Sequence, residues 1–185
     1  MTGGSMNRKG GTPREVAVPV SVFAALRTEL AKEAGTLPTV HALHHAGYHA
    51  GTAAAAVLSG NGESAPAALG RDAFWGKLAD FFGKRGWGTM RHDLTHSAVG
   101  ILSSTDWAEA GDGDADPDAS CFFSTGFLSG LLSELAGGPV AVLEVGCRTR
   151  GESACRFAFG SEAAIHNLYG RLLDGVDLDG ALAAL

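Results

Sequence analysis

The amino-acid sequence predicts an α+β fold in which an antiparallel sheet packs against several helices. Apolar residues recur with helical spacing in the first half of the chain. In the second half, two short strand-like runs, Val140–Val145 and Ala154–Phe159, flank a turn and have helical segments before and after them. This order is typical of an antiparallel α+β domain. The length of 185 residues predicts one domain over residues 13–185, preceded by a tail at residues 1–12 that is disordered or derived from an expression vector.

The composition is that of an ordinary globular protein. The net charge is −6, 45% of the residues are hydrophobic and 18% are charged. The acidic balance argues against direct nucleic-acid binding, which would need a basic patch. Glycines and charges interrupt each apolar run, and no basic segment precedes an apolar one near the N-terminus. We therefore expect no membrane span and no signal peptide, and a cytoplasmic location.

Three helices are expected in the first half. The first begins at Ser21, a candidate N-cap, and ends at Gly35. The second covers Leu37–Leu58 and is followed by loop residues. The third covers Ala65–Lys84, and its apolar stripe is expected to face the core. That stripe consists of Phe74, Leu78, Phe81 and Phe82.

The second helix is rich in histidine and in small residues. His41, His45 and His49 share one face, which makes a metal site conceivable. No carboxylate or cysteine lies in this helix to complete such a site, so we favour a polar face instead. The small residues predict close packing against another helix, and this gives modest support to a homodimer. They are Ala46, Gly47, Ala50, Gly51 and Ala53–Ala56.

The second half is predicted to mix strands and helices. Thr89–Trp107 shows partial alternation of apolar and polar residues and is predicted to be strand. The acidic segment Asp112–Asp118 imitates the start of a calcium loop but lacks the required glycine and glutamate, so we interpret it as a solvated loop. Ser161 is a candidate cap for a last helix at Glu162–Leu173, and a short apolar tail, Asp174–Leu185, follows.

All three cysteines lie in the stretch from residue 121 to residue 159, and with Glu144 they form the pattern C-x22-E-x2-C-x7-C. Cys121 belongs to a helical run, Cys147 to a turn, and Glu144 and Cys155 to the two strands that flank this turn. Three thiolates and a carboxylate suit a tetrahedral zinc ion, and four protein ligands make such a site structural. The alternative is that the cysteines are small apolar side chains. The spacing by itself leaves the two interpretations about equal.

Three strings in this stretch resemble the 4-vinyl reductase domain family. They are C-F-F-S-T-G-F-L-S-G-L-L from residue 121, P-V-A-V-L-E-V-G-C from residue 139, and G-E-S-A-C-R-F-A-F from residue 151. The resemblance is strong over residues 121–159 and looser from about Leu37 onward. It implies a fold related to the ligand-binding folds of nitric-oxide signalling and to TRAPP vesicle-tethering subunits.

The resemblance also implies a zinc site and a function. In aromatic-responsive transcription activators, the sensor domain of this family binds zinc through a Cys, Glu, Cys, Cys set. The corresponding residues here are Cys121, Glu144, Cys147 and Cys155. The implied function is a sensor-type, homodimeric domain that binds a hydrophobic or aromatic small molecule. This chain is expected to lack an output domain of its own and to pass its signal to a partner protein.

Two other functions stay open. The family name implies an enzyme or accessory protein of tetrapyrrole 4-vinyl reduction, of the bacteriochlorophyll type. The sequence contains no nicotinamide or flavin motif and no evident acid–base pair, so no catalytic residue is predicted. The second is a TRAPP-like scaffold, although the TRAPP subunits lack this zinc set.

A ligand of this kind would need a largely apolar cavity. We expect it between the sheet and the helices, close to the zinc without opening onto it. Few charges lie in the aromatic runs, so a charged ligand would lose its hydration without compensation, and a neutral aromatic or otherwise apolar ligand is favoured. The candidate lining residues are Phe81, Trp87, His96, Trp107, Phe122 and Phe127.

Overall fold

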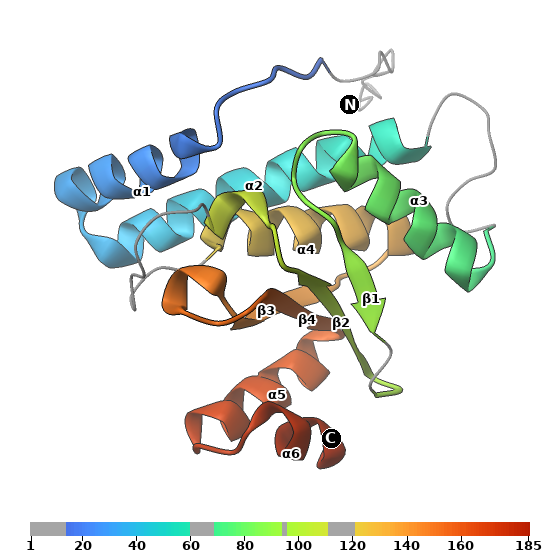
Figure 1. The fold of residues 1–185 in the computed structure, drawn as a ribbon. Helices are drawn as coiled ribbons and strands as arrows, with labels where there is room; N and C mark the ends of the chain where they lie inside the picture. Colours follow the sequence, from blue (N-terminus) through green and yellow to red (C-terminus); the bar gives the residue numbers. More distant parts are fainter. Residues whose placement is uncertain (1–13, 60–68, 94–95, 111–120) are drawn as a thin grey trace, which may run out of the picture.

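In the computed structural model, helices cover both faces of a four-stranded sheet (Figure 1). The structure describes residues 14–59, 69–93, 96–110 and 121–185. Every pair of neighbouring strands is antiparallel, and the spatial order is β1-β2-β4-β3. The predicted α+β class with an antiparallel sheet is confirmed. The strands are β1 (Arg91–Asp93), β2 (Val99–Ser104), β3 (Ala141–Gly146) and β4 (Cys155–Gly160).

The helices form two layers on opposite sides of the sheet (Figure 1). The upper layer in this view consists of α1 (Ser21–Ala34), α2 (Thr36–Ser59), α3 (Arg71–Gly83) and α4 (Phe122–Ala136). The lower layer consists of α5 (Glu162–Leu173) and α6 (Leu178–Ala183). Two short 3-10 helices, η2 (Ala108–Ala110) and η3 (Arg148–Arg150), lie in connections. None of the described helices combines the length and the hydropathy needed to cross a membrane.

The segment Thr89–Trp107, predicted to be strand throughout, contains two paired strands, β1 and β2. Its alternation is weak because β2 is buried on both faces. Val99 and Ile101 belong to the core shared with α5 and α6, whereas Leu102 belongs to the core under α2, α3 and α4. Leu94, which extended the predicted alternation, lies outside the described residues.

The ends of several elements differ from the sequence-based expectation. Helix α3 begins at Arg71 rather than at residue 65, and residues 65–68 lie outside the described part of the chain, as do the tail at residues 1–12 and the acidic segment at residues 112–118. The predicted apolar tail contains α6, because the carboxylate of Asp177 accepts the amide of Gly180 at 2.7 Å and caps a helix. Helix α5 has its predicted bounds, and Ser161 caps it by accepting the amide of Ala164.

Helices α2 and α4 pack with their backbones in contact. A Cβ atom on Gly47 or Gly51 would lie 2.0 Å from a carbonyl oxygen of α4. A Cβ atom on Gly126 or Gly130 would lie 2.0 or 2.1 Å from a carbonyl oxygen of α2. No side chain fits at these four positions. The close helix packing predicted for α2 is present, but its partner is α4 of the same chain, so these glycines no longer support a homodimer.

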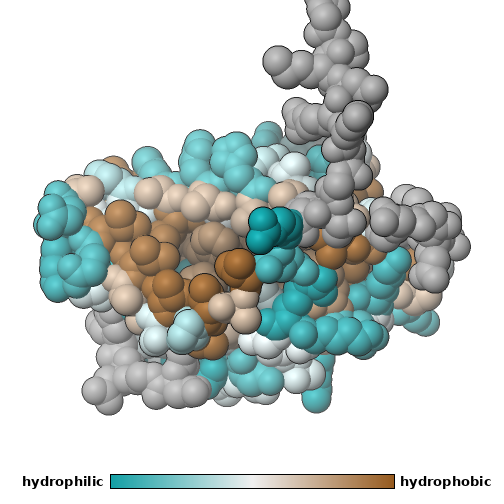
Figure 2. Space-filling model, turned by 90° about the horizontal axis from the view of Figure 1, so that it is seen from above, coloured by the Kyte–Doolittle hydropathy of each residue, from teal (hydrophilic) through white to brown (hydrophobic). Residues whose placement is uncertain are grey.

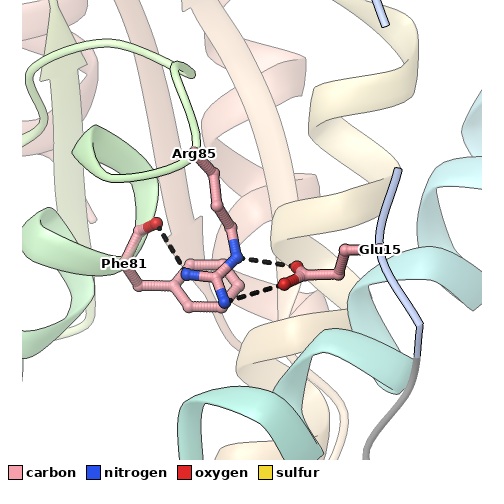
Figure 3. Close-up of polar contacts among 3 residues, drawn as sticks. All are labelled: Glu15, Phe81 and Arg85. Carbon is pink, nitrogen blue, oxygen red and sulfur yellow. Dashed lines mark hydrogen bonds and ion pairs between the residues drawn. The ribbon is translucent and has the colours of Figure 1, made fainter. Parts of the chain in front are cut away.

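An ion pair fastens the segment before α1 to the end of α3 (Figure 3). The guanidinium of Arg85 donates to both carboxylate oxygens of Glu15, at 2.7 and 3.0 Å. A third donor of the same guanidinium reaches the carbonyl oxygen of Phe81 at 3.2 Å, and the group lies 3.9 Å above the Phe81 ring. The hydrogen bond from Arg85 holds the pKa of Glu15 below its usual value. This segment is therefore tied to a residue of the aromatic core.

Helix α1 covers that core only partly. None of its residues is buried, and it is held mainly through the ring of Phe23, whose centroid lies 5.4 Å from that of Trp87 and 5.5 Å from that of Phe123. Hydrophobic side chains gather on the left of the face in Figure 2, where α1 lies in Figure 1. The exposed apolar residues of α1 and the segment before it are Val16, Val18, Val20 and Leu26.

The Gly51→Ala substitution is expected to destabilise the fold by about 1–3 kcal/mol, because the added methyl group forces α2 away from α4. The matched control is Gly170→Ala in α5, where a Cβ atom meets nothing within 4 Å. This control should stabilise the protein by up to about 1 kcal/mol through helix propensity. Urea unfolding measures both free energies. Equal effects of the two substitutions would contradict the close contact.

Candidate metal centre and ligand cavity

The side chains of Cys121, Glu144, Cys147 and Cys155 converge at one buried point, and their ligand atoms lie within 4.8 Å of one another. The sulfur of Cys121 is 4.0 Å from that of Cys147 and 3.9 Å from that of Cys155. Two thiolates bound to one tetrahedral zinc at about 2.3 Å would be about 3.8 Å apart. The donor set and the sulfur spacing therefore fit this ion. Among the described residues, no other group of three or more His, Cys, Asp or Glu side chains is placed to hold a metal.

An irregularity in β3 brings Glu144 and Cys147 to the same point. In a regular strand, side chains three positions apart face opposite sides of the sheet. The pairing of β3 with β4 shifts between Glu144 and Gly146, so β3 carries an extra residue there. This bulge changes the alternation, and both side chains reach the core side of the sheet.

The turn after β3 positions Cys147 and returns the chain to Cys155. The carbonyl oxygen of Cys147 accepts the amides of Arg150 and Glu152 at 3.1 and 3.2 Å, and the Glu152 carboxylate accepts the Cys147 amide at 3.3 Å. Gly151 has a φ of 92°, a left-handed conformation that favours glycine. The turn thus places two cysteines from adjacent strand ends beside each other.

The three thiols perturb one another. Hydrogen bonding with Cys147 and Cys155, together with burial, raises the pKa of the Cys121 thiol. Hydrogen bonding with Cys121 lowers the pKa of the Cys147 thiol. Three thiolates at this distance would repel each other strongly in a buried site unless a cation compensated their charge. A divalent metal supplies that compensation and binds the deprotonated thiols.

Two carboxylates hold the beginning of α4. The carboxylate of Glu144 accepts the amide of Cys121, the N-cap residue, at 2.9 Å. The carboxylate of Glu109, in η2, accepts the amides of Phe123 and Ser124 at 2.9 and 2.6 Å. Negative charge at a helix N-terminus is favourable because the first amides carry partial positive charge. Glu144 therefore links a candidate metal ligand to the helix that carries another one.

Glu109 also connects α4 to the aromatic core. The Ser124 hydroxyl donates to the Glu109 carboxylate and accepts the indole N–H of Trp107 at 2.8 Å. Burial raises the pKa of Glu109 to about 7, and the hydrogen bonds from Ser124 and Phe123 oppose that rise. No periodic pattern in the sequence marks Glu109, which is why sequence reasoning missed it.

The six predicted lining residues do not gather around one cavity. Phe81, Trp107 and Phe127 are buried in the aromatic core, and Trp87 packs against it. Phe122 borders a cavity of about 430 Å³ beside α1 and α2. His96 borders a different cavity of about 440 Å³ beside α3 and the sheet. Contact of any of the six with a ligand stays a prediction.

An apolar cavity of about 340 Å³ lies between α3, α4 and the sheet. Sequence reasoning assigned Phe74 to the core and did not single out Trp75. Adjacent residues of a helix point about 100° apart, so two consecutive aromatic side chains cannot both face the same core. That was the available signal for a second apolar surface. The lining residues are Phe74, Trp75, Leu132, Leu135, Ala136, Val140 and Phe159.

The histidines of α2 are exposed on one side of the helix. The rings of His45 and His49 lie 6.5 Å apart, and His41 is also exposed. The structure places no cysteine or carboxylate with them in a metal-binding group among the residues it describes. This arrangement agrees with an exposed polar face.

The buried carboxylate predicts a pH-dependent stability. Because the folded pKa of Glu109, about 7, lies above its ordinary value of 4.5, its stabilising effect is present below about pH 4.5 and lost as the pH rises through about 7. Glu109→Gln removes this titration. Its free energy of unfolding, minus that of the wild type, should therefore increase from pH 5 to pH 8, on the order of 2–3 kcal/mol.

Urea unfolding in the same zinc-saturated buffer measures both proteins, so the pH dependence of metal binding cancels in the difference. A difference that does not change between these two pH values would contradict the perturbed carboxylate.

Comparisons with known proteins identify the domain. The model of the 4-vinyl reductase domain family matches residues 109–161, a span that contains all four candidate metal ligands and Glu109. No curated protein sequence matches this chain.

Three solved structures share the fold. The phenol-responsive sensory domain of the transcription activator PoxR, solved with phenol, has a TM-score of 0.63 and 19% identity, covering 80% of this chain and 77% of that one. A trafficking protein particle complex subunit 3 from Naegleria fowleri, covalently bound to palmitic acid, has 0.62 and 13%, with coverages of 76% and 91%. A vinyl-4-reductase family protein from Methanocaldococcus jannaschii has 0.51 and 18%, with coverages of 78% and 82%. The resemblance to the 4-vinyl reductase family is thus confirmed, and residues 109–161 of this chain are the matched part of a 4-vinyl reductase domain.

Proposed function

We propose that this chain is a sensor-type domain that binds a hydrophobic or aromatic small molecule and is stabilised by a structural zinc ion. The observation that carries the proposal is that one helix and one strand join the candidate metal centre to the apolar cavity. Cys121 caps the start of α4 and Cys155 begins β4. Leu135 and Phe159, near the other ends of these elements, line the cavity.

Zinc would be held by Cys121, Glu144, Cys147 and Cys155. When bound, it supplies four strong bonds that tie α4 to β3 and β4 and compensate the thiolate charge. The four protein ligands complete a tetrahedral shell, so the site is structural and has no catalytic role in this proposal. A ligand that moves the far end of α4 or β4 would act against this fixed point, which gives a physical route from ligand to conformational change.

The apolar cavity supports a ligand that is apolar over most of its surface. Its volume of about 340 Å³ lies in the range of small-molecule sites, and aromatic and aliphatic side chains dominate its lining. Two proteins with this fold were solved with such molecules, phenol in one and covalently bound palmitic acid in the other. The six residues predicted from the sequence remain candidate contacts, and one of them, His96, borders the adjoining cavity.

A homodimer in the cytoplasm that signals to a partner protein is part of the proposal. Its support is the exposed apolar surface on α1 and on the segment before it, where Val16 is 83% exposed and Val18 is 56% exposed. Side chains of this kind commonly mark protein–protein contacts when they are grouped.

Native mass spectrometry of freshly purified protein should find one zinc per chain in a homodimer. Cys147→Ser should lose the zinc and lower the free energy of unfolding strongly, because metal binding contributes to folding. The matched control is Glu152→Gln, in the same turn but outside the candidate ligand set, and it should retain the metal. Well-folded, unoxidised protein with much less than one zinc per chain would sink the metal assignment, and a monomer would sink the dimer.

A thermal-shift screen of neutral aromatics should find compounds that raise the Tm. Ligand at about 100 times its Kd stabilises by about 2.7 kcal/mol, which corresponds to about 5 °C or more for a domain of this size. Leu135→Trp should fill the cavity and abolish the shift, whereas Leu173→Trp, on the exposed side of α5, should retain it. A zinc-bound protein that no compound stabilises would instead be a scaffold.

A further inference from the structure

A second cavity adjoins the apolar one and differs from it in polarity. It has a volume of about 440 Å³ and lies beside the start of α3 and the strands β1, β2 and β4. Its polar side chains include Arg71, His92 and His96, whereas the apolar cavity has no charged side chain in its lining. The two cavities share three aromatic side chains, Phe74, Trp75 and Phe159. They therefore meet along one aromatic wall.

That wall is built from rings packed against the sheet. The Trp75 ring stacks on the His92 ring at 3.8 Å with an interplanar angle of 11°, and its centroid lies 5.4 Å from that of Phe159. The Phe159 ring lies directly over Gly100, because a Cβ atom there would be 2.4 Å from a ring carbon. Gly100 thus makes the space in which Phe159 stands between the two cavities.

The charges around the polar cavity have one sign. Arg71 is the only residue among its described lining that carries a full charge at pH 7, and no carboxylate lines it. Burial lowers the pKa of His92, Arg71 lowers it further, and the neighbouring Asp93 opposes this. His92 is therefore a neutral ring that can donate one hydrogen bond, next to a permanent cation.

We propose that the two cavities form one amphipathic site for a monoanion, a carboxylate carried on an aromatic or short alkyl body. The body lies between α3 and α4 against Leu132 and Leu135, and the carboxylate lies at the side of Arg71 and His92. This inference rests on the proposed ligand-binding function and narrows its ligand class. The neutral ligand expected from the sequence considered only the aromatic runs, whereas the fold brings Arg71 to the rim of the apolar surface.

Isothermal titration calorimetry with 4-butylbenzoate and 4-butylbenzyl alcohol tests the proposal, because the two probes share a body and differ in charge. The wild type should bind the benzoate about tenfold more tightly, as expected for one charge-assisted contact. Arg71→Gln should remove this preference and leave the alcohol affinity unchanged. The matched control Arg91→Gln changes an exposed arginine of β1 that does not line the cavity, and it should keep the preference.

Equal affinity of the wild type for the two probes would overturn the anion site while leaving the proposed function intact, because the alcohol still binds. An equal loss of benzoate affinity in Arg71→Gln and Arg91→Gln would also overturn it, since the effect would then be general charge. If neither probe binds and Leu135→Trp changes nothing in the screen of neutral aromatics, the proposed function fails as well. Circular dichroism of each variant verifies that it is folded.

Discussion

The backbone contact between α2 and α4 sets the position of the rest of the site. Four glycines, two on each helix, let the carbonyl oxygens of one helix reach the Cα atoms of the other. Such an approach allows dispersion contacts and weak Cα–H···O interactions along the whole crossing. Because α4 is fixed in this way, its N-terminus meets the ends of β3 and β4, and its C-terminal half forms one wall of the apolar cavity.

The beginning of α4 is held by charge as well as by packing. Its first amides would be unpaired in an isolated helix, and the carboxylates of Glu109 and Glu144 accept them from two separate parts of the chain. Glu109 extends through Ser124 to the buried indole of Trp107, so the aromatic core and the helix start share one hydrogen-bonded network. Glu144 belongs at once to this cap and to the candidate metal centre. A change at either site is therefore expected to affect the same helix turn.

Much of the fold could be predicted from local pattern. The bounds of α5 follow from Ser161 and the apolar spacing after it, and β3 and β4 each lie within one residue of their predicted runs. The metal ligands could be proposed because C-x22-E-x2-C-x7-C is a spacing in the sequence, and the fold brings all four together. Strand β2 was harder to delimit, since burial on both faces removes the alternation on which strand prediction depends. The cap at Asp177 shows that a short helix can depend on one side chain that has no periodic context.

The sequence by itself determined the class of fold, the helix packing role of the small residues in α2, and the set of candidate metal ligands, because each is encoded in residue type and spacing. Only the tertiary structure decided which helix meets those glycines, which aromatics are solid core, and where open space remains. Trp107 and Phe127 resemble Trp75 and Phe159 as residue types, yet the first pair is packed in the core and the second lines cavities. Free space is what is left after all side chains have packed, so it depends on distances between segments far apart in the chain, which no local pattern records.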